Sequence, residues 1–208
     1  MADLEAVVAA ADLDRFALMG ISEGGTTAIA YAARHPERVT HLVLWGSFLG
    51  LAPFTATDAK RWEALYGLIE TGWGGDSPAF RQLFTALFLP DGTAEQNQHF
   101  NELQRTSATP QTARHFLTSV SQLDVREEAS QVRCPTLVMH RSGDLVVPLD
   151  EGRKLAAAIP GARMVTLPGN NHYMMWQEES TPETLRRMEE FLSQESTGAR
   201  SEAASAEG

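Results

Sequence analysis

The sequence of 208 residues contains a single cysteine, Cys134, and lacks any apolar run long enough to span a bilayer. A lone thiol excludes an internal disulfide framework and fits a reducing compartment, so we expect a cytoplasmic protein with Cys134 packed in its core. The chain also opens with neither a basic segment nor an apolar signal core, so nothing in it suggests export. We therefore expect no membrane partner.

Positive charge is scarce as well, with 17 Lys and Arg against 27 Asp and Glu and a formal net charge of -10. This balance disfavours binding to a phosphate backbone, so we expect no nucleic-acid partner. The spacing of His, Cys, Asp and Glu does not suggest a metal site, and the glycine patterns that cradle phosphates are missing. The sequence therefore predicts no metal and no cofactor.

Two parts of the chain alternate short apolar runs with helical patterns. Short apolar runs that end at turn residues are typical of buried strands, and a strand–helix–strand order predicts a parallel sheet flanked by helices. The α/β class follows from this order. The predicted strands are 15–19, 39–46, 135–140 and 162–167, and the predicted helices are 2–11, 24–34, 148–158 and 181–192.

The segment 51–128 has a different character. Its helical periodicities are broken by Gly and Pro, it holds no convincing strand, and its aromatic residues recur at spacings that suit helix faces. We interpret it as a helical cap or lid inserted into a core made of 1–50 and 129–194. The Ser-, Ala-, Glu- and Gly-rich tail, 195–208, cannot bury apolar area and is expected to be disordered.

The turn Gly20-Ile21-Ser22-Glu23-Gly24 follows the first predicted strand and opens a helix rich in small residues. Gly-x-Ser-x-Gly in that setting is the nucleophile elbow, which presents a serine oxygen to a crevice at the end of the sheet. We expect Ser22 to be the nucleophile and the backbone N–H of Glu23 to be an oxyanion donor. A side chain at Gly20 or at Gly24 is expected to clash with neighbouring backbone. The alternative is a glycine-rich turn without catalysis.

An acid and a histidine should follow the elbow in that order, each in a loop at the carboxyl end of a strand. Asp144 and His172 satisfy this for the strands 135–140 and 162–167. His172 would act as general base and then general acid, while Asp144 would fix its tautomer and stabilise the imidazolium. The competing candidates lie in helices, in strands or in the insertion; they are His35, His41, His99, His115, His140, Asp124 and Asp150.

Several segments carry a resemblance to a known family: 16–25 with 30–39, 134–140 with Gly143-Asp144, and 167–172. They resemble the α/β-hydrolases, and in particular the hydrolase domains that some bacterial signalling proteins carry beside nucleotide-cyclase or helix-turn-helix modules. The resemblance covers nearly the whole chain except the tail. It implies an esterase-like acyl hydrolase without a cofactor, with a lid made by the insertion.

One departure from that family is large. In the family, several strands and a His-Gly-type loop with the second oxyanion donor precede the elbow, whereas here 21 residues precede Ser22. The edge of the 15–19 strand would then be uncovered, which is a liability for an apolar strand. A truncation, a partner chain or a rearranged fold could each account for this, and we favour a homo-oligomer that covers the edge.

Two functions of different classes follow. The first is a serine carboxylic-ester hydrolase that acts on small to medium acyl esters through a Ser-His-Asp triad and an acyl-enzyme. The second is a catalytically weak ligand-sensing or interaction domain that retains the hydrolase scaffold. Peptidase, thioesterase, lactonase and perhydrolase activities stay open, because the same triad serves them all.

Overall fold

The computed structural model describes residues 1–50 and 56–194. The tail 195–208, for which the sequence predicts disorder, lies outside the described residues. No helix among those residues is both long and apolar enough to cross a membrane.

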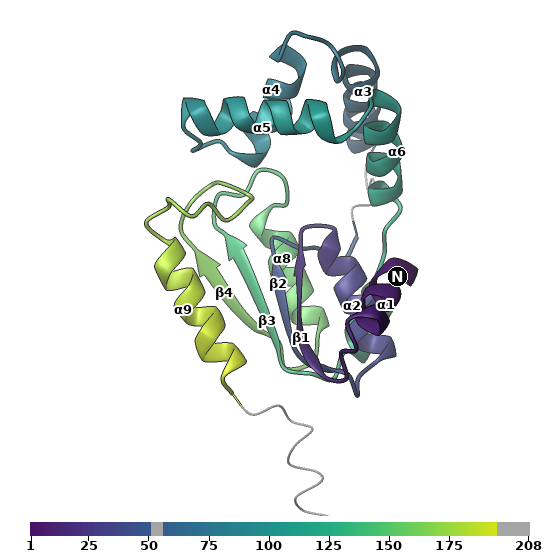
Figure 1. Ribbon diagram of the computed structural model, residues 1–208, viewed down its shortest axis with the longest axis vertical. Helices are drawn as coiled ribbons and strands as arrows, with labels where there is room; N and C mark the ends of the chain where they lie inside the picture. Colours follow the sequence, from purple (N-terminus) through teal and green to yellow (C-terminus); the bar gives the residue numbers. More distant parts are fainter. Residues whose placement is uncertain (51–55, 195–208) are drawn as a thin grey trace, which may run out of the picture.

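Within the described residues the sheet has four parallel strands in the order β1-β2-β3-β4, so each strand pairs with the next one along the chain (Figure 1). The central strands β2 and β3 are buried along almost their whole length, as expected where helices cover both faces of a parallel sheet. Ile21 pairs with Trp45, and Trp45 pairs with Met139, so the carboxyl ends of the first three strands lie level. The bounds are β1 Phe16–Ile21, β2 Val39–Trp45, β3 Thr136–Arg141 and β4 Arg163–Leu167.

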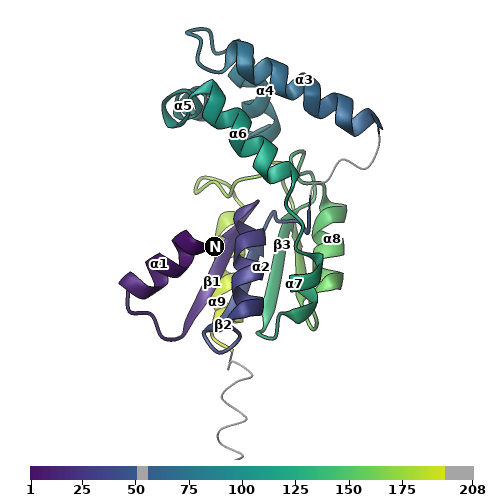
Figure 2. The same ribbon diagram turned by 90° about the vertical axis from the view of Figure 1, so that its right-hand side faces the viewer.

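Helices lie on both faces of this sheet (Figure 2). Leu42 and Leu44 of β2 point into a core shared with α2, α7 and α8, and α1 adds Val8 to it. Val43 and Trp45 point the other way, into a core shared with α9. The predicted parallel sheet flanked by helices is therefore confirmed. The bounds of these helices are α1 Ala2–Ala10, α2 Gly24–Arg34, α7 Arg126–Gln131, α8 Leu149–Ala158 and α9 Thr181–Leu192.

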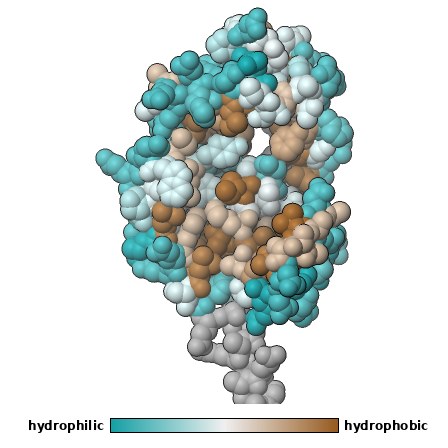
Figure 3. Space-filling model, viewed as in Figure 1, coloured by the Kyte–Doolittle hydropathy of each residue, from teal (hydrophilic) through white to brown (hydrophobic). Residues whose placement is uncertain are grey.

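The strand β1 forms one edge of the described sheet and is covered on one face only. Phe16 and Leu18 pack against the core under α2. Met19 and Ile21 alternate with them and are each 41% exposed. Apolar side chains gather over the sheet on the face that Figure 3 presents. The homo-oligomer expected to cover this edge stays a prediction.

The helices of the middle segment form a separate layer above the carboxyl ends of the strands (Figures 1 and 2). Ile69, Phe84 and Ala113 are buried together in a small core of this layer. Thr93 caps α5 with a capping box, and Thr109 caps α6. No strand of the described residues falls in this segment, as its sequence predicts. The bounds are α3 Ala56–Gly72, α4 Ala79–Phe88, α5 Ala94–Ser107 and α6 Pro110–Ser121.

Candidate active site

Ser22 lies on the turn between β1 and α2 with a φ of 53°, in the left-handed region that non-glycine residues rarely adopt. Its N–H donates to the carbonyl of Trp45 at 2.8 Å, and its own carbonyl accepts from Gly25 N–H at 3.1 Å. These bonds on both sides of the residue hold the strained backbone in place. The N–H of Glu23 then lies ahead of the first turn of α2, where backbone donors have no intrahelical acceptor. This is the elbow geometry that the sequence predicts.

The glycines around the elbow differ in how much space they leave. A Cβ on Gly20 would lie 2.5 Å from the Cα of Gly25, so the backbone requires glycine there. A Cβ on Gly24 would meet nothing within 4 Å, so the predicted clash at Gly24 is wrong. The second crowded position is Gly25 instead, where a Cβ would lie 2.1 Å from Ser47 Oγ. Close packing of α2 on the end of β2 causes this crowding.

His172 and Asp144 meet in the interior, as expected for a base and its orienting acid. The Nδ1 of His172 lies 2.6 Å from Oδ2 of Asp144, and both side chains are almost fully buried. Since a carboxylate only accepts, Nδ1 carries the proton, and in the neutral ring Nε2 then presents a lone pair. The other carboxylate oxygen, Oδ1, accepts from the N–H groups of Val146 and Val147 at 2.9 Å each. Those bonds fix the acid and stabilise its negative charge.

The Nε2 of His172 is buried and has no hydrogen-bond partner among the described residues. The ring lies over Gly46, where a Cβ would be 3.0 Å from its Cε1. Trp45, which precedes Gly46, accepts from the N–H of Ser22, so the imidazole and the elbow flank the same end of β2. The described residues contain no hydrogen bond between Ser22 and His172. Such bonds tighten when substrate binds.

Trp45 and Gly46 are part of the site although sequence reasoning did not select them. The indole Nε1 of Trp45 donates to the carbonyl of His172 at 2.7 Å, so one residue contacts both the elbow and the histidine loop. Gly46 has a φ of 55° and leaves room for the imidazole. The available signal was a Trp-Gly-Ser turn at the end of the predicted strand 39–46, at the same sheet edge as Ser22.

The competing candidates have other contacts. His140 is buried, and its ring Nε2 lies 2.8 Å from the carbonyl of Val147 and 3.8 Å from Asp144 Oδ2. His41 packs edge-on against Phe191 in the core under α9. Among the other candidates, His35 lies close to Glu5 and Glu37, Asp124 pairs with Arg126, and Asp150 pairs with Arg153.

A cavity of about 780 Å³ opens between α5 and the loop that follows His172. Tyr173, in its wall, stacks on Phe88 at 5.4 Å between ring centroids and meets the ring of His172 edge-on at 5.4 Å. Burial, followed by the nearby carboxylate of Glu23, raises the pKa of Tyr173 to about 12, so the phenol stays neutral at ordinary pH. The lining residues are Leu89, Thr93, Glu95, Gln96, His99, Phe100, Leu103, Tyr173, Met175 and Gln177.

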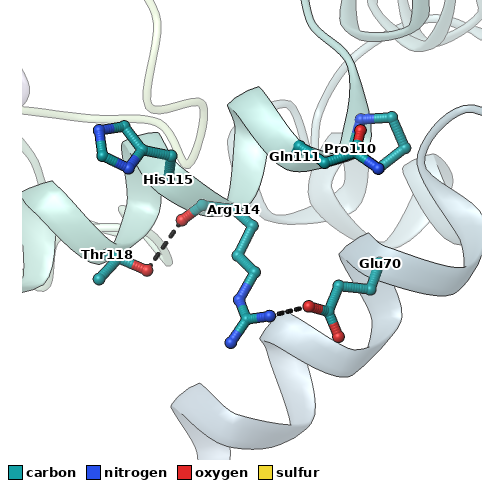
Figure 4. Close-up of a pocket in the computed structure, with 6 residues that line it drawn as sticks. All are labelled: Glu70, Pro110, Gln111, Arg114, His115 and Thr118. Atoms are coloured by element: carbon teal, nitrogen blue, oxygen red, sulfur yellow. Dashed lines mark hydrogen bonds and ion pairs between the residues drawn. The ribbon is translucent and has the colours of Figure 1, made fainter.

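A second hollow, of about 510 Å³, lies between α3 and α6 (Figure 4). Arg114 forms an ion pair with Glu70 across it, so its charge is already neutralised. Neither Ser22, Asp144 nor His172 lines this hollow. They do not line the cavity beside Tyr173 either, but that cavity adjoins the candidate active site through Tyr173, whose ring contacts the ring of His172.

Comparison with known proteins identifies the class. Residues 1–179 match the family described as alpha/beta hydrolase fold. The chain therefore belongs to the α/β-hydrolase fold family, which confirms the resemblance in its motifs. The narrower resemblance to hydrolase domains beside cyclase or helix-turn-helix modules stays a prediction.

Individual relatives are distant hydrolases. The chain is 29% identical over 188 residues to a protein named as a carbamate hydrolase, RutD, from Klebsiella pneumoniae, covering 89% of this chain and 69% of the relative. It is 29% identical over 194 residues to the 2-hydroxy-6-oxo-6-phenylhexa-2,4-dienoate hydrolase of Comamonas testosteroni, covering 88% and 64%. The chain thus spans about two thirds of the length of these relatives.

Solved structures agree on the fold. An esterase from Exiguobacterium antarcticum superposes with a TM-score of 0.75 at 22% identity, covering 89% of this chain and 70% of that one. A bromoperoxidase from Bacillus anthracis gives 0.76 at 21% identity, covering 92% and 72%. At these identities the likeness concerns the fold alone.

Proposed function

We propose that the protein is a serine hydrolase that cleaves carboxylic esters of small to medium acyl groups through an acyl-enzyme. One observation carries the proposal most. His172 is bound to Asp144 through Nδ1, and its Nε2, which has no partner in the described part of the chain, lies at the end of β2 that Ser22 also borders. A nucleophile, a base and an orienting acid in that order are what acyl transfer requires.

In the proposed reaction, Ser22 Oγ attacks the ester carbonyl while His172 Nε2 accepts its proton. Asp144 stabilises the imidazolium, which then gives that proton to the departing alkoxide. A water molecule next attacks the acyl-enzyme, with His172 again taking the proton and returning it to Ser22. The acid is released, and the enzyme is restored.

The oxyanion that forms in each half-reaction needs donors. We propose the backbone N–H of Glu23 as one of them, since it lies at the N-terminus of α2, where the helix dipole also favours negative charge. A single lost donor costs about 2.7–4 kcal/mol of transition-state stabilisation, or ~100- to 1000-fold in rate.

Substrate selection is assigned to the layer formed by α3 to α6, which we propose acts as a cap. Most of the surface that lines the cavity beside Tyr173 is apolar, which suits an acyl chain. The names of the relatives add carbamates and 2-hydroxy-6-oxo acids to the substrates worth testing. All of these substrates present a carbonyl carbon to the nucleophile.

The test compares hydrolysis of p-nitrophenyl acetate and butyrate by wild type and by Ser22→Ala. Removing the nucleophile should lower kcat by about 10⁴-fold or more. Ser47→Ala is the matched control, because Ser47 is also buried beside the elbow and its hydroxyl donates to the backbone carbonyls of Gly20 and Trp45. It should retain most of the activity, and a serine-reactive phosphonate should label it as it labels wild type.

Equal rates for wild type and Ser22→Ala, together with no phosphonate labelling, would reject the hydrolase. The alternative, a ligand-sensing domain on a hydrolase scaffold, would then be preferred. Binding of an acyl compound in the cavity, detected by a rise in Tm without turnover, would support that alternative.

A further inference from the structure

The loop that carries His172 is held by hydrogen bonds from two sides. Its two preceding residues, Asn170 and Asn171, each contact a carboxylate from another part of the chain. Asn170 donates through its N–H and its amide to Asp91, at 2.8–3.2 Å, and Asn171 donates to Glu178 Oε1 at 2.7 Å. Asp91 belongs to the turn between α4 and α5, whereas Glu178 precedes α9.

On the other side of the loop, Glu178 is held by a buried arginine, Arg141. Arg141 is 1% exposed, and its guanidinium pairs with Glu178 and donates to the carbonyl of Pro168 at 2.5 Å. It also lies 5.3 Å from the ring of Trp45, the residue that donates to the carbonyl of His172. A buried guanidinium with these partners has little freedom to move, because losing Glu178 would leave its buried charge unpaired.

The contacts on the Asp91 side of the loop connect residues 170–172 with the helical layer. The N–H of His172 donates to the carbonyl of Phe88 at 2.8 Å, and the N–H of Asp91 donates to Asn171 Oδ1 at 2.9 Å. Residues 170, 171 and 172 are thus each bonded to the turn 88–91. Asp91 is exposed, and its carboxylate, which accepts from Asn170, is the charged group in these contacts.

We propose that Asp91 is a positioning residue for His172, through which the helical layer sets the geometry of the general base. The inference rests on the proposed function and deepens it. It also gives the cavity a role, because Leu89 and Tyr173 in its wall belong to the two segments that Asp91 joins. A loop position that is off by about 1 Å can cost ~100-fold in rate.

The experiment measures kcat and KM for p-nitrophenyl butyrate with wild type, Asp91→Ala and Asp91→Asn. Asp91→Ala should lower kcat by about 10- to 100-fold, with KM changing less than about threefold. Asp91→Asn keeps one acceptor oxygen for the N–H of Asn170 and should recover part of kcat. Because Asp91 is exposed, both variants should fold, and circular dichroism and Tm verify this.

Glu102→Gln is the matched control, because it removes an exposed carboxylate and its ion pair with Arg105 from the same helical layer without touching the histidine loop. Its kcat should equal that of wild type. A second readout is the downfield proton resonance of the His172 Nδ1–H, which should broaden or disappear in Asp91→Ala and persist in Glu102→Gln.

The outcomes separate the two proposals. If wild type does not hydrolyse the ester, the proposed function fails, and with it this inference. If wild type is active and Asp91→Ala matches it in kcat and in the downfield resonance, only the positioning role of Asp91 is overturned. Equal losses of kcat in Asp91→Ala and Glu102→Gln would overturn it as well.

Discussion

The two halves of the candidate site are built in different ways. The elbow around Ser22 depends on neighbours within a few residues, Gly20 and Gly25, and on one bond to the adjacent strand. The loop of His172 depends on distant segments. Trp45, which donates to the carbonyl of His172, lies 127 residues from it along the chain, and Asp144, which binds its ring, lies 28 residues from it. The nucleophile's geometry is therefore a local property of the chain, whereas the base takes its place only when the whole domain has assembled.

This difference implies different sensitivities. A substitution in the elbow should destabilise the protein strongly at Gly20, where a Cβ would meet backbone, and little at Gly24, where space is open. Substitutions around the histidine loop should lower kcat by different amounts, because several independent contacts hold the loop in place. Substitutions on each side, and on the residue that joins them, distinguish these behaviours.

The largest effect is expected on the histidine side, at Asp144. Asp144→Asn should lower kcat for p-nitrophenyl esters by about 10⁴-fold, because an amide can leave His172 in the wrong tautomer while the fold stays intact. Asp150→Asn is the matched control, since Asp150 forms an exposed pair with Arg153 in the first turn of α8. A loss below tenfold in Asp144→Asn would mean that another group orients the base, with His140 beside Asp144 the first to examine.

On the elbow side, the contrast lies between Gly20 and Gly24. Gly20→Ala would bring a Cβ to 2.5 Å from the Cα of Gly25 and should lower the free energy of unfolding by about 3 kcal/mol. Gly24→Ala has open space at the start of α2, and its free energy of unfolding should stay within about 1 kcal/mol of wild type. Urea unfolding of the two variants measures both. Equal destabilisation would contradict the local origin of the elbow.

Sequence patterns predict the elbow well for the same reason that it is local. The glycine spacing, the apolar strand before it and the small-residue helix after it lie within 20 residues, and β1, α2 and β2 formed nearly where expected. Asp144 and His172 could be selected by their order at strand ends. Trp45, Asp91 and Glu178 could not, because their roles arise from contacts between segments far apart in the chain. The clash expected at Gly24 was wrong because Gly25 makes the close contact with Ser47.

The smallest effect is expected at Trp45, which joins the two halves. Trp45→Phe keeps the backbone carbonyl that accepts from Ser22 but removes the indole N–H that donates to His172. An unsatisfied buried carbonyl costs about 1–3 kcal/mol in the free energy of unfolding. Because this carbonyl belongs to His172, we expect the position of the base to suffer and kcat to fall roughly 10-fold, while a phosphonate still labels Ser22.

Trp73→Phe provides the control for Trp45→Phe, because Trp73 makes the same kind of indole bond, to the carbonyl of Ala108 at 3.1 Å, within the helical layer. Both variants should lose similar stability in thermal unfolding, and only Trp45→Phe should lose turnover. If the two variants lose kcat equally, the bond from Trp45 has no special bearing on His172. In that case the loop is held by its contacts with Asp91, Glu178 and the carbonyl of Phe88, and the elbow and the base are coupled only through the fold as a whole.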